Sequence, residues 1–579
     1  MGNTTVRSPF RLADALRVLA NSRYNGNWCD PETEAAFGVL LHDEGFLRSV
    51  AEGDTGAWNG RKWRAAMYQL GFITPEIVRG LPAGQVDIRI QQVAAGMAGV
   101  SGRQYEVTPN GRRLAAARTV IQMEECFLRS LLAYRVPSPI EKGTHLCPPF
   151  SPLRIVLLTM RNLKAAGLND HISFEEMASL VQFCKSEKDV PRLVSEIEAY
   201  RGARKASANK RVFDENFRRQ ERSGHGDPVT MGSLNDYADV NFRYLRATGL
   251  ITRAKASIVS AMEKRREVEL ILQQPDEWPG DDAYLRRLWD GAALPTDVAS
   301  EAVLAIQNLE HELRAGGLTP EVPDLSSFAV PELQQIRLRL ESERRTLREE
   351  TFAHAQRQHI GSIAELLALM QNKNERSAAY KSEAPAYLEW VVWRAFLAIN
   401  SLSNKPWEVR QFNIDAEMNP LSPASSRKPD MICEFDDWVL VVEVTFTESS
   451  RQEAAEGEPV RRHVADVTHR HAGLKPVYGL FLAPKIDTNT AETFGRGTFV
   501  LGGDRVPVAV VPMTIAQFAS LFNDGFARPG GLGPVEIRGF LDSCVKLRTD
   551  DGETWKAAIG GLLRDHLAAT TTISMEVRG

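Results

Sequence analysis

The sequence lacks the cysteine spacing on which zinc-binding and disulfide-bonded domains are built. None of its six cysteines forms a C-x-x-C pair. They are Cys29, Cys126, Cys147, Cys184, Cys433 and Cys544. Structural zinc sites usually draw on closely spaced cysteine or histidine pairs, and disulfide frameworks are typical of secreted proteins. The cysteine pattern therefore argues against both and fits a reducing cytoplasm, the location that we expect.

Long hydrophobic runs and net positive charge are also scarce. No run approaches the ~20 apolar residues of a membrane span, and the N-terminal stretch M-G-N-T-T-V-R-S-P-F has no apolar region of the signal-peptide kind. The formal net charge is −4, so any contact with nucleic acid must come from local basic patches. At 579 residues the chain is too long for one core, and roughly three to four domains are expected.

One stretch in the C-terminal half predicts a β-hairpin on which two acids face each other. Two runs of strand-forming residues, 431–434 and 438–446, flank Asp436-Asp437, which suits a tight turn. Counting outward from that turn places Asp430 opposite Glu443, with Cβ atoms roughly 4.5–5.5 Å apart. Carboxylates so placed repel each other unless a cation lies between them, and a hard divalent cation prefers oxygen ligands. A chance pairing of two acids is the alternative interpretation.

The N-terminal half carries two candidate DNA-reading modules. In the first, residues 60–69 predict an amphipathic helix, and residues 105–114 predict a strand, a turn and a helix start, like the wing of a winged helix. The apolar stripe of the helix consists of Trp63, Ala66, Met67 and Leu70. Candidates for DNA contact are Arg61, Lys62, Arg64 and, in the wing, Arg112. A solvated charged face is the alternative for these cations.

The second module spans residues 150–270. Residues 152–166 predict a helix, Ser173 and Glu176 form a capping-box pattern, and residues 201–222 are basic. Residues 233–252 predict a recognition helix and the strand after it. Its Asn241, Arg243 and Arg246 are of the types that read base edges, since Asn pairs with adenine and Arg with guanine.

Two helical runs, 297–314 and 331–358, follow the second module. The second run is charged almost all round, which is typical of a helix that bridges modules. We therefore expect a helical linker that sets the distance between a binding part and a cutting part. A partner-binding coiled coil is the alternative, although sustained heptads are absent.

The last third alternates between predicted helices and strands. The predicted order is a helix at 384–400, a strand at 407–414, the hairpin, a short helix opened by Ser450 and Glu453 and ended by Gly457, a helix at 459–470, strands at 477–482 and 506–513, and a helix at 514–522. A helix, a three-stranded meander, a helix and a further strand is the order of a PD-(D/E)xK nuclease core.

The hairpin and the segment after it resemble a known family. Pro429-Asp430, twelve residues, Glu443-Val444-Thr445 and then S-R-Q-E-A-A-E-G-E-P-V-R-R-H-V are similar to the AlwI/BstNBI group of type IIS restriction and nicking endonucleases. Thr445 stands where the usual nuclease motif has lysine, and the group shares this departure. The resemblance implies a mainly helical, winged-helix recognition half (residues 1–140 and 141–285), a helical linker (286–375) and a PD-(D/E)xK α/β nuclease domain (376–579).

The resemblance also implies roles for individual residues. Asp430 and Glu443 would hold Mg²⁺. Glu389 on the preceding helix resembles the extra acid that completes a second metal site or orients water, with a helix-surface acid as its alternative. Glu456 matches a further active-site acid of the group, and His463 would contact phosphate or water.

Other residues compete for these roles. Glu453 and Glu458 are rivals of Glu456, and Lys485 is a candidate for the displaced lysine. The cluster His469-Arg470-His471 looks like a metal site, but residues two apart do not share a helix face.

The sequence thus predicts a type IIS restriction endonuclease that binds a short asymmetric site in double-stranded DNA and cuts outside it with Mg²⁺. It would nick one strand as a monomer, and a transient homodimer or a partner nuclease subunit would cut the second strand. A cognate methyltransferase is the expected companion. Two alternatives stay open: a DNA repair or recombination nuclease that reads DNA shape, and a non-catalytic winged-helix protein with a decayed nuclease domain.

Overall fold

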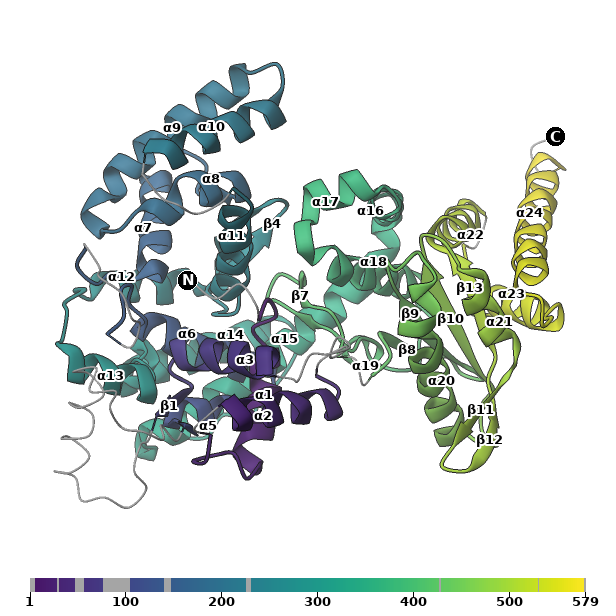
Figure 1. The fold of residues 1–579 in the computed structure, drawn as a ribbon, viewed down its shortest axis with the longest axis horizontal. Helices are drawn as coiled ribbons and strands as arrows, with labels where there is room; N and C mark the ends of the chain where they lie inside the picture. Colours follow the sequence, from purple (N-terminus) through teal and green to yellow (C-terminus); the bar gives the residue numbers. More distant parts are fainter. Residues whose placement is uncertain are drawn as a thin grey trace. The chain divides into compact units, whose positions relative to one another are not determined.

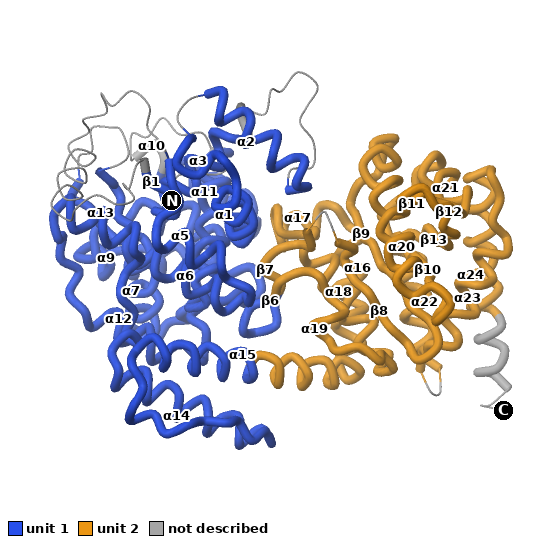
Figure 2. The backbone as a smooth tube through the Cα atoms, turned by 90° about the horizontal axis from the view of Figure 1, so that it is seen from below, with its two compact units in different colours: residues 1–344, 415–419 blue, residues 345–414, 420–579 orange. Residues whose placement is uncertain are grey.

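The computed structural model describes residues 6–28, 31–46, 57–75, 105–139, 147–224, 231–425, 428–528 and 531–576. The chain divides into two compact units, unit 1 with residues 1–344 and 415–419 and unit 2 with residues 345–414 and 420–579 (Figure 2). The described cysteines are free thiols, and Cys29 lies outside the described residues. None of the described helices is both long and apolar enough to cross a membrane.

Unit 1 is mainly helical, with two small sheets (Figure 1). Its principal elements are α1 (Arg11–Asn21), α2 (Pro31–Asp43), α3 (Ala57–Gln69), β1 (Ile73–Pro75), β2 (Tyr105–Val107), α5 (Pro109–Ala116), α6 (Val120–Ala133), α7 (Pro152–Ala165), β3 (Ile172–Ser173), α8 (Phe174–Ser179), α9 (Val190–Ala206), α10 (Lys210–Gly224), α11 (Met231–Arg246), β4 (Ile251–Ala254), β5 (Ser257–Ser260), α12 (Arg265–Gln273), α13 (Asp281–Asp290), α14 (Ala299–Ala315) and the first part of α15 (Val330–Ala355).

The helix and the strand predicted for the first module form as α3 and β2. Helix α3 buries the apolar stripe that its spacing predicts, because Trp63, Ala66, Met67 and Leu70 are all at most 5% exposed. Strands β1 and β2 pair antiparallel. Thr108 then caps α5 by accepting a hydrogen bond from the Gly111 N–H, and Pro109 opens the helix.

The second module also has a helix followed by an antiparallel strand pair, and it contains additional helices. Strands β4 and β5 form an antiparallel hairpin after α11, and β3 pairs with β5 to complete a sheet in the order β3-β5-β4. The predicted capping box forms, since Ser173 and Glu176 each bond the other's backbone N–H at the start of α8. The helices α9 and α10 are inserted between α8 and α11.

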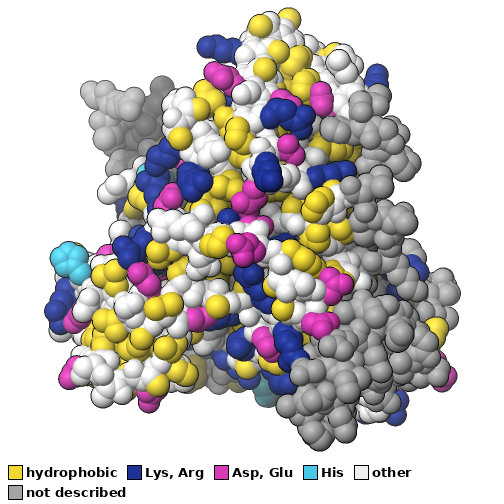
Figure 3. Space-filling model, turned by 90° about the vertical axis from the view of Figure 1, so that its left-hand side faces the viewer, with side chains coloured by type: hydrophobic (Ala, Val, Ile, Leu, Met, Phe, Trp, Pro, Cys, Tyr) yellow, Lys and Arg dark blue, Asp and Glu magenta, His cyan; other side chains and the backbone are white. Residues whose placement is uncertain are grey.

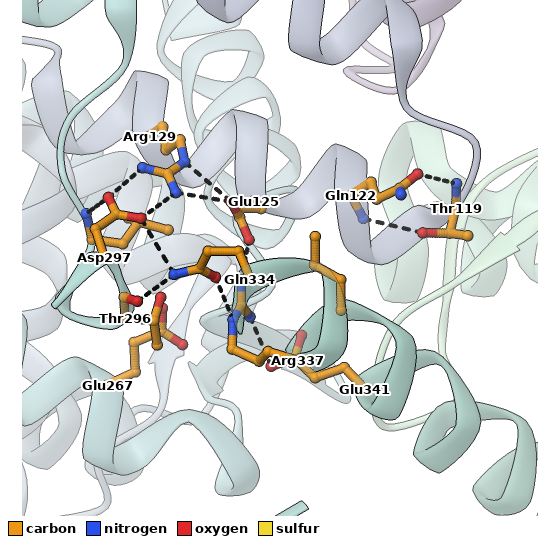
Figure 4. Close-up of polar contacts among 12 residues, drawn as sticks. Thr119, Gln122, Glu125, Arg129, Glu267, Thr296, Asp297, Gln334, Arg337 and Glu341 are labelled. Carbon is orange, nitrogen blue, oxygen red and sulfur yellow. Dashed lines mark hydrogen bonds and ion pairs between the residues drawn. The ribbon is translucent and has the colours of Figure 1, made fainter. Parts of the chain in front are cut away.

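Helix α15 forms where the second charged helical run is predicted. Several of its charged side chains are buried, among them Arg337 and Glu341. Arg337 pairs with Glu125 of α6 and, at 3.1 Å, with Glu341, which lies 3.0 Å from Lys264 (Figure 4). The boundary between the units falls after Arg344, inside this helix. Some charged side chains of α15 are therefore engaged in ion pairs, whereas others, such as Arg339, are exposed.

Unit 2 carries the larger sheet. Its principal elements are α16 (Ile360–Gln371), α17 (Lys373–Tyr380), α18 (Ala384–Ile399), α19 (Pro406–Val409), β6 (Asn413–Ile414), β7 (Pro420–Ser422), β8 (Met431–Glu434), β9 (Val439–Val444), a π-helical stretch (Glu453–Gly457), α20 (Glu458–Arg470), β10 (Val477–Ala483), α21 (Thr488–Gly495), β11 (Thr498–Leu501), β12 (Asp504–Pro507), β13 (Val510–Thr514), α22 (Ile515–Ala527), α23 (Pro534–Lys546) and α24 (Gly552–Glu576).

The central sheet has the order β13-β10-β9-β8, with β8 antiparallel to β9 and the other neighbours parallel. Strands buried on both faces of a parallel sheet read as continuous apolar runs, and V-L-V-V-E-V of β9 is such a run with one acid in it. Helix α20 is the crossover between β9 and β10 and contacts both strands, while α22 contacts β10 and β13 (Figure 1).

Three predicted elements of this half are wrong in detail. Residues 407–414 form α19 and the two-residue β6 instead of one strand, because Pro406 opens a helical turn that Glu408 caps at the Lys405 N–H. Strand β6 pairs with β7 in a separate sheet, so only an isolated bridge, Arg410 to Met431, joins this region to β8 in place of the predicted meander. Residues 506–513 divide between β12 and β13, which belong to different sheets.

The helix boundary predicted at Gly457 is also wrong. Gly457 has φ −59° and ψ −48°, ordinary helical values, and the chain passes through the π-helical stretch directly into α20. The predicted capping pair does not form either, because the Glu453 carboxylate accepts a hydrogen bond from the Thr493 hydroxyl instead. Helix α20 ends at Arg470, as predicted.

Candidate active site

The β8–β9 hairpin brings Asp430 beside Glu443 in the predicted register. Glu434 pairs with Val439 and Met431 with Val442, so the next residues outward are Asp430 and Glu443. The Asp430 Oδ2 atom accepts a hydrogen bond from the Val444 N–H at 2.8 Å. The side chain that precedes β8 is therefore fixed against the strand that carries Glu443.

Glu443 is a buried acid with a histidine partner. Its side chain comes from the middle of the sheet, between β8 and β10, and the residue is 9% exposed. The His463 Nδ1 atom of α20 lies 2.6 Å from the Glu443 Oε1 atom. Burial, followed by repulsion from Arg462, lowers the pKa of His463 to about 4. In the neutral ring, the tautomer with its proton on Nδ1 donates a hydrogen bond to the Glu443 carboxylate.

Thr445, at the position of the usual motif lysine, bonds another predicted site residue. Its hydroxyl donates to the Glu456 Oε1 atom at 2.9 Å, and it accepts a hydrogen bond from the Thr447 N–H at 3.2 Å. Glu456 lies in the π-helical stretch before α20. Single π-helical turns are frequent at functional sites. A hydroxyl bonded to a carboxylate occupies the lysine position here.

Glu389 is buried, which excludes the alternative of a helix-surface acid. It lies on α18, is 4% exposed, and its Oε2 atom accepts a hydrogen bond from the Ala424 N–H at 2.8 Å. Ala424 belongs to the segment that leads into Pro429-Asp430. The described residues contain no group of three or more His, Cys, Asp and Glu side chains placed to hold a metal ion. Glu389 thus anchors this segment and does not join Asp430 and Glu443 in a ready-made ligand set.

The donor chemistry of the remaining pair suits magnesium. Mg²⁺ is usually held by one or two carboxylates together with water and substrate phosphates, and not by an all-protein cage. Asp430 and Glu443 supply two carboxylates at opposed positions of one hairpin. The residues present therefore fit an ion whose other ligands come from water and DNA.

A cation near the end of β9 is not apparent from the sequence. The Arg376 guanidinium of α17 lies 4.1 Å from the ring centroid of Phe446, and its Nη2 atom is 3.6 Å from Glu448. Arg376 also donates to the Met370 carbonyl oxygen at 3.1 Å. The residues around Arg376 have the pattern of an ordinary helix, and the partners of Arg376 lie about 70 residues downstream. No local signal in the sequence could therefore have identified Arg376.

The predicted DNA contacts of the first module have different surroundings. Arg61 and Arg112 are exposed, and Lys62 is half-buried. Arg64 pairs with Glu34 and donates to the Tyr105 hydroxyl at 3.0 Å. Arg64 is therefore engaged within unit 1, whereas Arg61 and Arg112 face solvent.

The predicted base-reading residues of α11 are buried. Asn241, Arg243 and Arg246 are 8%, 7% and 1% exposed. The Arg243 Nε atom lies 3.1 Å from Asp239, and the Arg246 Nη2 atom lies 3.4 Å from Asp415. These placements do not fit the expectation that the three residues read base edges. A helical period does not reveal which polar residues are buried against partners that are distant in the sequence.

A family model and a solved structure match this chain. The family model of the AlwI restriction endonuclease matches residues 68–521. One similar solved structure is the small subunit of the heterodimeric restriction endonuclease R.BspD6I, at 21% identity and a TM-score of 0.29, covering 35% of this chain and 98% of that chain. No curated protein matches the chain. Because the family model spans well over half of the sequence, including β8 and β9, the chain belongs to the AlwI restriction endonuclease family.

Proposed function

We propose that this protein is a type IIS restriction endonuclease, which binds a short asymmetric sequence in double-stranded DNA and hydrolyses phosphodiester bonds outside that sequence with Mg²⁺. The observation that carries the proposal is the opposed pair Asp430 and Glu443 on the β8–β9 hairpin. Membership of a restriction endonuclease family supplies the reaction class. The sheet with its crossover helix α20 supports a PD-(D/E)xK core for unit 2.

The side chains around the pair have separate tasks in this mechanism. Asp430 and Glu443 would hold Mg²⁺, which would polarise the scissile phosphate and lower the pKa of an attacking water. The Val444 N–H fixes Asp430, and His463 fixes Glu443 without neutralising it. Thr445 positions Glu456 at the edge of the site. Of these, Glu456 is the candidate to orient water.

Recognition is assigned to unit 1. A helix followed by an antiparallel strand pair occurs twice, as α3 with β1–β2 and as α11 with β4–β5, which supports two winged-helix modules. The exposed Arg61 and Arg112 are the contacts that we propose for the first module. The partners of the whole system would be DNA, a second nuclease domain for the other strand, and a cognate methyltransferase.

Cleavage of a plasmid ladder in Mg²⁺ tests the proposal. We expect discrete bands from the purified protein and none after Asp430→Ala or Glu443→Ala, with DNA binding retained by both variants. Glu434→Ala is the matched control, because Glu434 is an acid on the same hairpin at its turn end. Structure-specific cuts would favour a repair nuclease, and a wild-type protein that binds but never cuts would favour a decayed one. Full activity in either variant would refute the metal site.

A further inference from the structure

Helices α9 and α10 form a hairpin with its own aromatic core. Tyr200 of α9 packs on Phe217 of α10 at a centroid distance of 4.8 Å and on Phe213 at 5.6 Å. The Tyr200 hydroxyl donates to Asp214 at 2.6 Å. Residues 207–209 join the two helices at the end that we call the tip (Figure 1). The hairpin is thus a packed element of unit 1, and residues 207–209 form its tip.

The arginines along the body of the hairpin are paired with acids. Arg204 lies 2.7 Å from Asp214, and Arg219 lies 3.1 Å from Glu215. Arg201 lies 2.7 Å from Glu176, and Arg218 pairs with Glu175. These four guanidiniums stabilise the hairpin and its contact with α8, so their charge is already balanced.

The cations at the tip differ from those of the body. Lys205, Lys210 and Arg211 are all exposed, and the sequence from 205 to 213 contains no acid. In the part of the chain that the structure describes, none of the three makes an ion pair. At the other end of α9, Lys185 and Lys188 are exposed beside Glu187 and Asp189. The lysines at the base therefore have acids beside them in the sequence, whereas the cations at the tip have none between residues 205 and 213.

We propose that this tip, comprising Lys205, Lys210 and Arg211, binds the phosphate backbone of DNA. The inference rests on the proposed function, in which unit 1 holds DNA. The net charge of the chain is −4, so attraction to DNA must come from local patches without nearby carboxylates. On the face of the molecule drawn in Figure 3, Lys and Arg side chains are interspersed with Asp and Glu. The acid-free tip is suited to uniform contact with phosphates, independent of base sequence.

Salt dependence of binding tests the tip in the full-length protein. The variant Lys205→Gln/Lys210→Gln is compared with Lys185→Gln/Lys188→Gln, which loses the same charge from the same hairpin about 25 Å away along α9. Anisotropy of a labelled random-sequence duplex is measured in EDTA over a range of salt. Each phosphate contact contributes about 0.9 to the slope of log K against log salt. Between about 50 and 200 mM salt, wild-type affinity should therefore fall roughly tenfold more than that of the tip variant.

The outcomes separate this inference from the proposed function. Loss of slope in the tip variant alone, with unchanged thermal melting, supports the tip as a backbone contact. Equal slopes in wild-type protein and both variants, with sequence-specific cleavage intact, would overturn the inference and leave the proposed function standing. Equal losses in both variants would also overturn it, because total charge and not the tip would then control binding. A wild-type protein without affinity for DNA would overturn both proposals.

Discussion

The Thr445 hydroxyl is the residue-scale feature that most distinguishes this site from a lysine-containing nuclease motif. Lysine would place a cation beside the carboxylates of Asp430 and Glu443, which we propose to hold the metal ion. Threonine instead donates a hydrogen bond to Glu456, at 2.9 Å, and so holds an additional acid at the edge of the site. The positive charge that lysine supplies must then come from the metal ion or from another residue of the chain.

Thr445→Val should slow cleavage while leaving the fold intact. Valine keeps the shape of threonine but cannot donate to Glu456, and loss of such a supporting hydrogen bond typically costs 10–100-fold in activity or metal affinity. Cleavage rate against Mg²⁺ concentration is the measurement, and the loss should shrink at high Mg²⁺ if affinity is affected. Thr468→Val is the control, because the Thr468 hydroxyl bonds only the Val464 carbonyl oxygen of its own helix. Equal rates for Thr445→Val and wild-type protein would remove Thr445 from the site.

The sequence could predict some residues of the site and not others, for a physical reason. Asp430 and Glu443 are set by the register of one hairpin, which depends on a turn a few residues away. Arg246 is fixed by Asp415, 169 positions further along the chain, and such a contact leaves no local signal. Glu389 was identified as a candidate, but its bond to the Ala424 N–H required the structure.

At the scale of elements, α15 shows that a highly charged helix can bury some of its charged side chains. The run is charged almost all round, yet Arg337 is 4% exposed and lies between Glu125 and Glu341. Burial raises the pKa of Glu341, but Lys264 and Arg337 outweigh it, so the net shift is downward. An acid with a depressed pKa stabilises the fold above its ordinary pKa near 4.5, and that contribution is lost as the pH falls.

Arg337→Ala should destabilise unit 1 far more than Arg339→Ala, two positions along the same helix. Removing Arg337 breaks its pairs with Glu125 and Glu341 and leaves each acid with one cation, Arg129 and Lys264 respectively. Breaking a buried ion pair costs about 3–5 kcal/mol. Arg339 is exposed and pairs with Glu343 at the surface, and such pairs contribute about 0–1 kcal/mol. Urea unfolding of the full chain, followed by tryptophan fluorescence, gives both values. Similar midpoints for the two variants would show that the network around Arg337 is not stabilising.

Elements with a strong local pattern were predicted well, and the exceptions have local causes. Helices α3, α7 and α22 and strand β10 lie where apolar spacing places them. The failures are β6, shortened by the helical turn at Pro406, and the helix expected to stop at Gly457. Glycine permits a helix to end but does not force the end, because glycine also adopts helical φ values.

At the scale of the whole molecule, the chain crosses between the units more than once. Residues 415–419 lie between β6 and β7 of unit 2 but belong to unit 1. The Asp415 carboxylate there accepts a hydrogen bond from the Thr252 hydroxyl at 2.7 Å and pairs with Arg246. No composition shift or linker marks this excursion, so sequence analysis placed the domain boundaries without it.

A fragment that ends at residue 344 should fold and bind DNA better than one that ends at 285. The shorter fragment lacks Arg337 and Glu341, so it leaves the half-buried Glu125 and Lys264 with fewer partners. The longer one keeps this network and loses only the contribution of residues 415–419. Thermal melting and gel shifts on a plasmid digest compare the two. Equal melting and equal binding would show that the first part of α15 is dispensable to unit 1.

The number of active centres per chain sets how DNA is cut. The sequence holds one Pro-Asp…Glu-Val-Thr centre, at Asp430 and Glu443, and one centre has one in-line geometry. In the proposed mechanism, such a centre would hydrolyse one phosphodiester in each docking event. The two modules of unit 1 differ from each other, so one chain does not have the twofold symmetry that a palindromic site mirrors. We expect binding to an asymmetric site and rapid cleavage of a single strand, with the second strand depending on another nuclease domain.

Cleavage of supercoiled plasmid at increasing protein concentration tests whether cutting of the second strand depends on another nuclease domain. Open circles should accumulate first, because nicking needs one chain. If the second centre comes from a transient homodimer, linear product should rise more steeply than first order in protein. If it comes from a different subunit, open circles should persist at every concentration, and the protein alone acts as a nickase. Linear product formed directly at low concentration, without a nicked intermediate, would show that two centres act together from the start, which a single hairpin site per chain cannot provide.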